Sequence, residues 1–220
     1  MPGFLERALK AAANTSFSFG QILIQEANGG FVVFHREDET RKDLQTCRHA
    51  EDAVEIAKYD DAGNYRPLKT APNLRRGWRL TLKTLEELER ALDYFYPGRL
   101  AVFAAWKTSQ LRTTSLRETL ERQSGMYRVA GKISDHQIDD LVGDFCRSDG
   151  GCLRTILWKR DRDGAIASIK LPKEKFDPVH DQAATGPRSA TAATVPLLCQ
   201  EPCNLLVAEC RKVVTGARPR

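Results

Sequence analysis

The stretch CRSDGGC at residues 146–152 and the stretch CQEPC at residues 199–203 decide how the second half of this 220-residue chain folds. Together they hold four of its six cysteines, spaced Cys-x5-Cys and Cys-x3-Cys, and the long segment 153–198 separates the two pairs. Cysteines clustered in this way indicate metal or redox chemistry in a reducing cytosol, where disulfides are rare. The sequence therefore predicts that folding brings two distant cysteine pairs to one metal centre.

The spacing of these cysteines is typical of an iron–sulfur cluster, whose core needs thiolates that converge from different directions. The glycines of the first stretch permit unusual backbone angles and let backbone N–H groups approach the sulfurs. The proline before Cys203 predicts a helix N-terminus, where free N–H groups and the helix dipole favour an anion. Arg147 and Arg154 add positive charge nearby. The predicted ligands of a [4Fe–4S] cluster are Cys146, Cys152, Cys199 and Cys203.

Two other interpretations of these cysteines remain open. Structural zinc also takes four cysteines, although its ligand pairs are usually spaced two to four residues apart, and the x5 gap is long for that. Free cysteine is also a common core residue, so the four residues can be unrelated. Cys210 lies among apolar residues of the last predicted helix and is expected in the core, and Cys47 has no partner nearby.

The first half of the chain predicts a small α+β domain over residues 1–97. Thr84 and Glu87 form a capping box before a strongly periodic helix, and the sequence Asn28-Gly29-Gly30 supplies the turn of a β-hairpin. The expected elements are a helix over 1–13, hairpin strands over 17–26 and 31–36, a helix over 50–59, strands over 65–69 and 78–82, and a helix over 85–95. His35 and His49 are expected at the surface or in packing roles.

The second half, residues 98–220, predicts a mainly helical cluster-binding domain. Ser134 is the expected cap of the helix that ends at Cys146. The expected elements are helices over 100–111, 115–123 and 135–145, a buried segment over 153–159 that is helix or strand, an exposed loop over 172–196, and a final helix over 202–214. The predicted fold class is α+β, a small α+β domain followed by this helical domain.

Composition and charge exclude several classes of function. The net charge of +5 is spread along the chain, without the basic stripe interleaved with aromatics that is typical of nucleic-acid binding. No apolar run approaches the ~20 residues that cross a bilayer, and residues 1–13 lack the pattern of a signal peptide. We therefore expect a cytoplasmic protein that binds neither nucleic acid nor membrane. The sequence does not indicate its oligomeric state.

Three segments resemble the iron–sulfur region of the sirohydrochlorin cobaltochelatase-like proteins. They are RQSGMY at residues 122–127, CLRTILW at 152–158 and CQEPCNLLV at 199–207. In that family a small stabilising domain precedes a [4Fe–4S]-binding domain, and some members carry a chelatase domain ahead of both. The resemblance implies a stabilising domain over residues 1–97 and the same four cysteine ligands. It does not imply metal insertion by this chain, in which we expect no chelatase domain.

The function expected first is that of a cluster-carrying accessory or redox factor in tetrapyrrole metabolism, of cobalamin or sirohaem, with a chelatase or redox protein as partner. The tetrapyrrole link rests on the resemblance alone. The alternative is a structural metal-site module, zinc or cluster, whose role is partner binding. No nucleophile–base pair, paired carboxylates or phosphate loop has convincing spacing, so no catalytic residue is predicted. An enzymatic role would be associated with a tetrapyrrole metal chelatase. Trp158 is expected in the core around the cluster.

Overall fold

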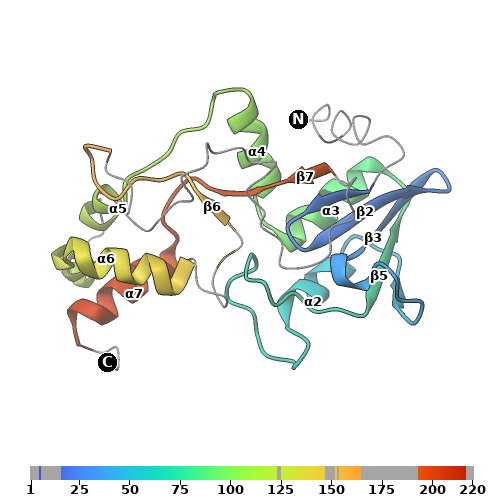
Figure 1. Ribbon diagram of the computed structural model, residues 1–220, viewed down its shortest axis with the longest axis horizontal. Helices are drawn as coiled ribbons and strands as arrows, with labels where there is room; N and C mark the ends of the chain where they lie inside the picture. Colours follow the sequence, from blue (N-terminus) through green and yellow to red (C-terminus); the bar gives the residue numbers. More distant parts are fainter. Residues whose placement is uncertain are drawn as a thin grey trace. The chain divides into compact units, whose positions relative to one another are not determined.

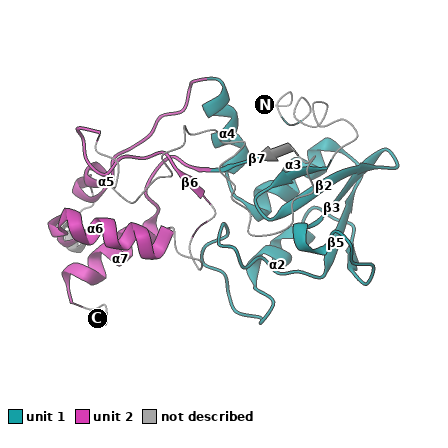
Figure 2. Cartoon of the chain, viewed as in Figure 1, with its two compact units in different colours: residues 1–108, 176–197 teal, residues 109–175, 198–220 magenta. Residues whose placement is uncertain are grey.

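The computed structural model describes residues 5, 16–122, 125–146, 152, 154–164 and 193–216. The chain divides into two compact units, shown in Figure 2: unit 1 is Met1–Thr108 with Phe176–Leu197, and unit 2 is Ser109–Lys175 with Leu198–Arg220. The helix predicted over 1–13 lies outside the described residues apart from Leu5, which is helical and buried. Most of the loop predicted over 172–196 also lies outside them, and its last part is wrong, because Ala193–Val195 forms a strand and Val195 is buried. The domain boundary predicted at residue 97 stays a prediction.

Unit 1 is built on a six-stranded sheet in the order β4-β5-β3-β2-β1-β7 (Figure 1). The strands are β1 (Phe17–Phe19), β2 (Ile22–Ala27), β3 (Gly30–His35), β4 (Gln45–Cys47), β5 (Trp78–Leu82) and β7 (Ala193–Val195). The inner pairs are antiparallel, whereas β4 pairs with β5 and β7 pairs with β1 in parallel. The late segment β7 therefore completes a sheet that the first part of the chain begins.

The hairpin of β2 and β3 confirms the turn predicted from Asn28 and Gly29. Both residues have positive φ, 53° and 76°, which is the conformation that a tight hairpin turn requires. The single strand predicted over 17–26 is wrong, because the chain turns at Gly20 and forms two antiparallel strands, β1 and β2. Gly20 has a φ of 61°, and an added Cβ would lie 2.8 Å from the ring of Tyr96. This turn therefore depends on a residue far along the chain.

The helices of unit 1 are α2 (Asp52–Lys58), α3 (Leu85–Phe95) and α4 (Arg99–Lys107), with a short 3-10 helix η1 (Arg36–Asp38). The capping box predicted for α3 is confirmed: Thr84 Oγ1 accepts from the Glu87 N–H at 3.1 Å, and the Glu87 carboxylate accepts from the Thr84 N–H at 3.3 Å. The apolar face of α3 is fully buried. Helices α2 and α3 contact each other and β5, so this face covers the sheet.

The strand predicted over 65–69 is wrong, and a buried arginine explains why. This part of the chain forms only an isolated bridge between Tyr59 and Tyr65. Arg66 is 1% exposed, and its guanidinium donates to the Asn73 side chain and to three backbone carbonyl oxygens, those of Ala57, Lys69 and Ala71, at 2.8–3.0 Å. The carbonyl group of Lys69, inside the predicted strand, is therefore used by this cation and not by a neighbouring strand.

Unit 2 is mainly helical, as predicted, and the fold class is α+β. Its elements are α5 (Leu116–Arg122), the 3-10 helix η2 (Gly125–Lys132), α6 (Asp135–Leu141), the π-helical turn η3 (Val142–Cys146), β6 (Arg154–Ile156), β8 (Leu197–Cys199) and α7 (Asn204–Val214). Ser134 and Gln137 form a capping box before α6, as expected of Ser134. Helices α6 and α7 lie side by side and contact each other (Figure 1).

The core of unit 2 gathers apolar residues from its helices and from β6 and β8. Ile138, Leu141 and Val142 contribute the buried stripe predicted for the third helix. The segment 153–159, left open as helix or strand, contains β6, which pairs with β8 in a two-stranded sheet. No helix among the described residues is long and apolar enough to cross a membrane.

Candidate metal centre

The first cysteine pair lies at the end of a helix. Cys146 is the last residue of the π-helical turn η3, which continues α6. The backbone N–H of Cys152 donates to the carbonyl oxygen of Cys146 at 3.2 Å, so the two ends of the CRSDGGC stretch lie together. A π-helical turn such as η3 inserts an extra residue into a helix and redirects the side chains that follow. Such turns are frequent at functional sites.

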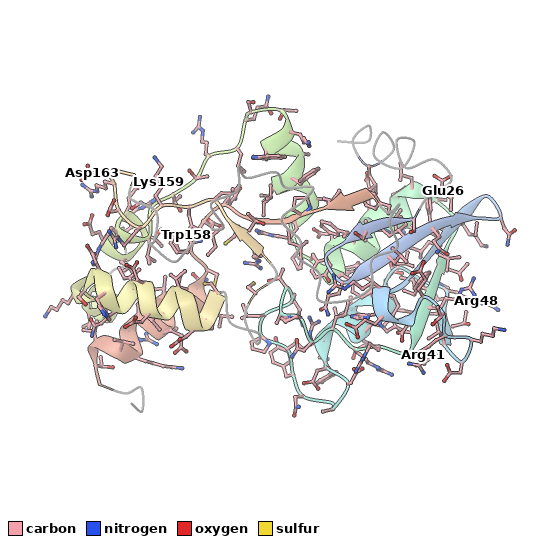
Figure 3. The ribbon with its side chains drawn as sticks, viewed as in Figure 1. Glu26, Arg41, Arg48, Trp158, Lys159 and Asp163 are labelled. Carbon is pink, nitrogen blue, oxygen red and sulfur yellow. The ribbon has the colours of Figure 1, made fainter. Side chains whose placement is uncertain are left out.

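Cys199 ends the strand β8 and is 8% exposed. Its carbonyl oxygen accepts from the Leu157 N–H at 2.9 Å, which fixes the strand against the segment after β6. The side chain of Trp158 is hydrogen-bonded to Cys199. Because the indole N–H is the only polar hydrogen of that side chain, Trp158 donates and the sulfur accepts. Figure 3 labels Trp158, which is 1% exposed, and this confirms its expected place in the core.

Cys203 is the N-cap of α7, which confirms the helix N-terminus predicted from the CQEPC stretch. Its Sγ accepts a hydrogen bond from the Leu206 N–H at 3.5 Å. The thiol therefore occupies the place where Ser, Thr or Asp usually stands, facing free N–H groups and the positive end of the helix dipole.

The structure gathers these cysteines in unit 2. Cys199 belongs to the buried core cluster of this unit, and Cys146 and Cys203 pack against the same cluster. Cys152 is hydrogen-bonded to Cys146 through the backbone, and its charge acts on Cys199. In the part of the chain that the structure describes, no three His, Cys, Asp or Glu side chains are arranged to hold a single metal ion. The four-cysteine ligand set therefore stays a prediction.

Burial and charge act in opposite directions on Cys199. Burial raises the pKa of its thiol, whereas the positive charge of Arg154 and the hydrogen bond from Trp158 lower the pKa. The nearby Cys152 and Cys203 raise the pKa of Cys199 further when they are ionised, because like charges repel. A bound cation or cluster that neutralises several thiolates at once removes this repulsion.

The other two cysteines lie in different surroundings. Cys210 is fully buried on α7, as predicted, and burial raises the pKa of its thiol to about 12. It therefore stays a neutral thiol at physiological pH. Cys47 ends β4 in unit 1, and burial, followed by the charge of Asp52, raises the pKa of its thiol.

Buried polar atoms near the cysteines give a test of whether an anionic cluster fits. Among the described residues, two buried side-chain polar atoms have no hydrogen-bond partner: Nε of Arg154 and Oγ1 of Thr114. The charge of Arg154 acts on Cys199, and the Thr114 N–H donates to the carbonyl oxygen of Gln200 at 3.2 Å. Both atoms thus belong to residues close to β8. An N–H donor and a hydroxyl donor without acceptors suit a cluster, whose sulfurs accept hydrogen bonds.

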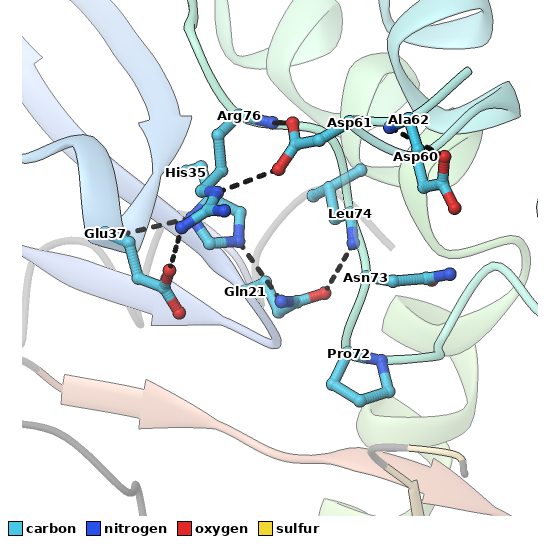
Figure 4. A pocket seen from close by; sticks show the side chains of 10 residues that line it. All are labelled: Gln21, His35, Glu37, Asp60, Asp61, Ala62, Pro72, Asn73, Leu74 and Arg76. Carbon is cyan, nitrogen blue, oxygen red and sulfur yellow. Dashed lines mark hydrogen bonds and ion pairs between the residues drawn. The ribbon is translucent and has the colours of Figure 1, made fainter. Parts of the chain in front are cut away.

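Unit 1 contains a polar cavity of about 330 Å³, shown in Figure 4. The cavity is lined by Gln21, His35, Glu37, Asp60, Asp61, Ala62, Pro72, Asn73, Leu74 and Arg76. The Leu74 N–H donates to Gln21 Oε1 at 3.1 Å, and the Glu37 N–H donates to His35 Nδ1 at 3.1 Å. Sequence reasoning gave His35 a surface or packing role and missed Gln21, because a single glutamine carries no pattern. These hydrogen bonds hold the packing of unit 1. The candidate metal centre is therefore the cysteine group of unit 2, not this cavity.

Comparisons with known proteins divide the chain near residue 108, where unit 2 begins, although residues 176–197 of unit 1 fall within the second match. Residues 6–110 match the family model of the DR2241 stabilising domain, and residues 108–212 match that of the 4Fe-4S iron-sulfur cluster binding domain. A search of curated proteins gave no match.

A solved structure extends over both halves. It is the crystal structure of DR2241 from Deinococcus radiodurans, described as a multi-domain protein with structural similarity to chelatases but also with two additional novel domains. The TM-score is 0.73 at 28% sequence identity, and the match covers 96% of this chain and 41% of that chain. This protein therefore spans less than half the length of DR2241. The chain belongs to the family in which a DR2241-type stabilising domain is followed by a 4Fe-4S iron-sulfur cluster binding domain.

Proposed function

We propose that Cys146, Cys152, Cys199 and Cys203 are the ligands of the [4Fe–4S] cluster. The observation that carries this assignment is the position of Cys199 and Cys203, one at a buried strand end and one at a helix N-cap, inside the matched cluster-binding domain. Cys146 packs against the same core, and Cys152 is joined to it through the backbone. The remaining cysteines fit less well, because Cys210 is a core thiol and Cys47 belongs to unit 1.

The proposed role is that of a cluster-carrying redox or accessory factor in tetrapyrrole biosynthesis, of cobalamin or sirohaem. The link is supported by the similarity of DR2241 to chelatases that its description states, together with the resemblance of the cysteine segments. The proposed partner is a chelatase or redox protein. An [Fe–S] cluster supplies one-electron chemistry when bound. The four cysteines of this chain would hold it, and the Leu206 N–H and the Trp158 side chain would donate hydrogen bonds to two of them, Cys203 and Cys199.

A structural role for the cluster is the second candidate, and the placement of the cysteines favours it. Cys146 ends η3, Cys199 ends β8 and Cys203 precedes α7, so one cluster would cross-link segments far apart in the sequence. A group that binds only the folded state stabilises that state. A cluster of this kind, or zinc in its place, would hold unit 2 in the form that contacts a partner protein.

Iron content tests the ligand assignment. We expect about four irons and four sulfides per chain after purification without air, with broad absorbance near ~400 nm. The Cys199→Ala variant is expected to lose the cluster, and Cys47→Ala, its matched control in unit 1, is expected to keep full iron content. Equal iron loss in both variants would contradict the assignment. Colourless protein with one zinc would favour the structural module.

Reversible reduction separates the two roles. An electron carrier is expected to take up and release one electron per cluster through repeated cycles with dithionite and a mild oxidant. A purely structural cluster is expected to resist reduction or to break down in the first cycle, while its removal lowers the thermal stability of the protein.

A further inference from the structure

The strongest unexplained feature of unit 2 is Nε of Arg154, which is buried and has no hydrogen-bond partner among the described residues. Arg66 in unit 1 shows the usual arrangement, since its Nε and both terminal nitrogens donate to oxygen acceptors at 2.8–3.0 Å. Buried guanidinium groups are normally paired in this way, because an unpaired N–H in a dry site is costly. The contrast indicates that Arg154 faces an acceptor that protein atoms do not provide.

The position of Arg154 indicates what that acceptor is. Arg154 is the first residue of β6, which pairs with β8, and β8 ends at Cys199. Its positive charge acts on the Cys199 side chain, and Trp158 from the same segment is hydrogen-bonded to that side chain. Two N–H donors, those of Arg154 and Trp158, therefore belong to the segment that contains β6, whose partner strand β8 ends at Cys199. Sulfur atoms that carry negative charge are the acceptors that match such donors.

We propose that Arg154 is a positioning residue that donates its Nε–H to a sulfur of the bound cluster and raises the reduction potential of the cluster. This inference rests on the proposed four-cysteine ligand set. Reduction adds one electron to a cluster that is already anionic, and no bond to a protein atom forms or breaks. A fixed cation and an N–H donor stabilise the added negative charge, so they favour the reduced state. They also slow the loss of the cluster, because they stabilise its bound form.

The test compares three variants with the wild-type protein. Arg154→Gln removes the charge and the guanidinium, and Arg154→Lys keeps the charge without Nε. Arg160→Gln is the matched control, because Arg160 is a partly buried arginine of unit 2 whose guanidinium is paired with Asp139 at 3.1 Å and with Asp161 at 3.4 Å. Midpoint potentials are measured by anaerobic titration with dithionite and redox mediators. We expect a shift to more negative potential in R154Q, a smaller shift in R154K and none in R160Q.

Stability in the two metal states gives an independent readout. Nε of Arg154 has no protein acceptor among the described residues, so R154Q is expected to melt at the same temperature as the wild type or higher after chelation. In the loaded protein, R154Q is expected to melt lower and to release iron several-fold faster to a chelator. A purely structural arginine would instead lower both melting temperatures together, which would overturn the inference.

The remaining outcomes are also decisive. A wild-type protein with full iron content and an R154Q potential equal to that of the wild type would overturn this inference alone. Wild-type protein that takes up no iron would overturn the ligand assignment, and the inference with it. An R160Q shift as large as that of R154Q would show a general charge effect without a specific donor, and would also overturn it.

Discussion

At the scale of single residues, His35 is the clearest case of chemistry set by burial. It is 1% exposed at the end of β3, and its Nδ1 accepts from the Glu37 N–H. Burial lowers its pKa from 6.5 to about 4. The charges of Glu37 and Asp38 raise the pKa, and those of Arg36 and Arg76 lower it. The imidazole is therefore neutral in the folded protein at physiological pH, and its ring packs as part of unit 1.

This burial predicts a pH dependence of stability. Between about pH 6.5 and pH 4 the unfolded chain binds a proton at His35 that the folded protein does not, so the free energy of unfolding falls as pH falls. The full loss is on the order of 3 kcal/mol. Urea unfolding at pH 7.0, 5.5 and 4.5 measures it. His35→Gln is expected to flatten this slope, and the control His49→Gln, at an exposed position, is expected to leave the slope unchanged. Equal slopes in all three proteins would contradict the prediction.

At the scale of elements, the β2–β3 hairpin meets β5 so closely that one position admits only glycine. A Cβ at Gly30 would lie 2.4 Å from the backbone oxygen of Leu82, and backbone in the middle of a sheet cannot move aside cheaply. Gly131 in η2 offers a comparison, because an added Cβ there would meet no atom within 4 Å. The same substitution therefore has opposite expected effects in the two elements.

Alanine at both glycines tests this account. Gly30→Ala is expected to destabilise the protein by about 1–3 kcal/mol, because it forces strands β3 and β5 apart. Gly131→Ala is expected to be neutral or to stabilise by about 0.4–1 kcal/mol, since alanine restricts the unfolded chain more than glycine does. Thermal and urea unfolding measure both effects. A Gly30→Ala protein as stable as the wild type would show that the strands accommodate the methyl group.

At the scale of the whole molecule, the proposed ligands all belong to one unit. Cys146, Cys152, Cys199 and Cys203 lie in unit 2, whereas the sheet of unit 1 contains only Cys47. The energy of cluster binding therefore supports the folding of unit 2 directly. Unit 1 has its own core, built from the sheet with α2 and α3.

Removal of the cluster is expected to act unequally on the two units. Hydrogen exchange of the full chain, before and after anaerobic chelation, measures this residue by residue. We expect amides of α6, α7 and β8 to lose protection by at least ten-fold, which corresponds to about 1.4 kcal/mol of local opening free energy, and amides of β3 and α3 to change little. Equal loss of protection in both units would contradict the assignment of the cluster to unit 2.

The local features of this protein were determined by the sequence itself. The turn at Asn28 and Gly29, the capping box at Thr84 and the helix N-terminus at Cys203 were all predicted, because each depends on residues within one turn of the chain. The spacing of the cysteines likewise predicted the [4Fe–4S] cluster that the family match supports. The turn, the capping box, the helix N-terminus and the spacing within each cysteine pair are short-range patterns. Such patterns do not depend on the rest of the chain.

Only the tertiary structure decided how distant segments meet. The strand predicted over 17–26 breaks at Gly20 because the Tyr96 hydroxyl, 75 residues from Gln21, accepts the Gln21 N–H at 2.9 Å. Strand β7 joins β1 from the far end of the chain, and Arg66 binds the carbonyl oxygen of Lys69 inside the predicted strand 65–69. The lack of a protein acceptor for Nε of Arg154 among the described residues is likewise a feature of the tertiary structure. Each depends on which buried polar groups find partners, and that is settled only when the chain is folded.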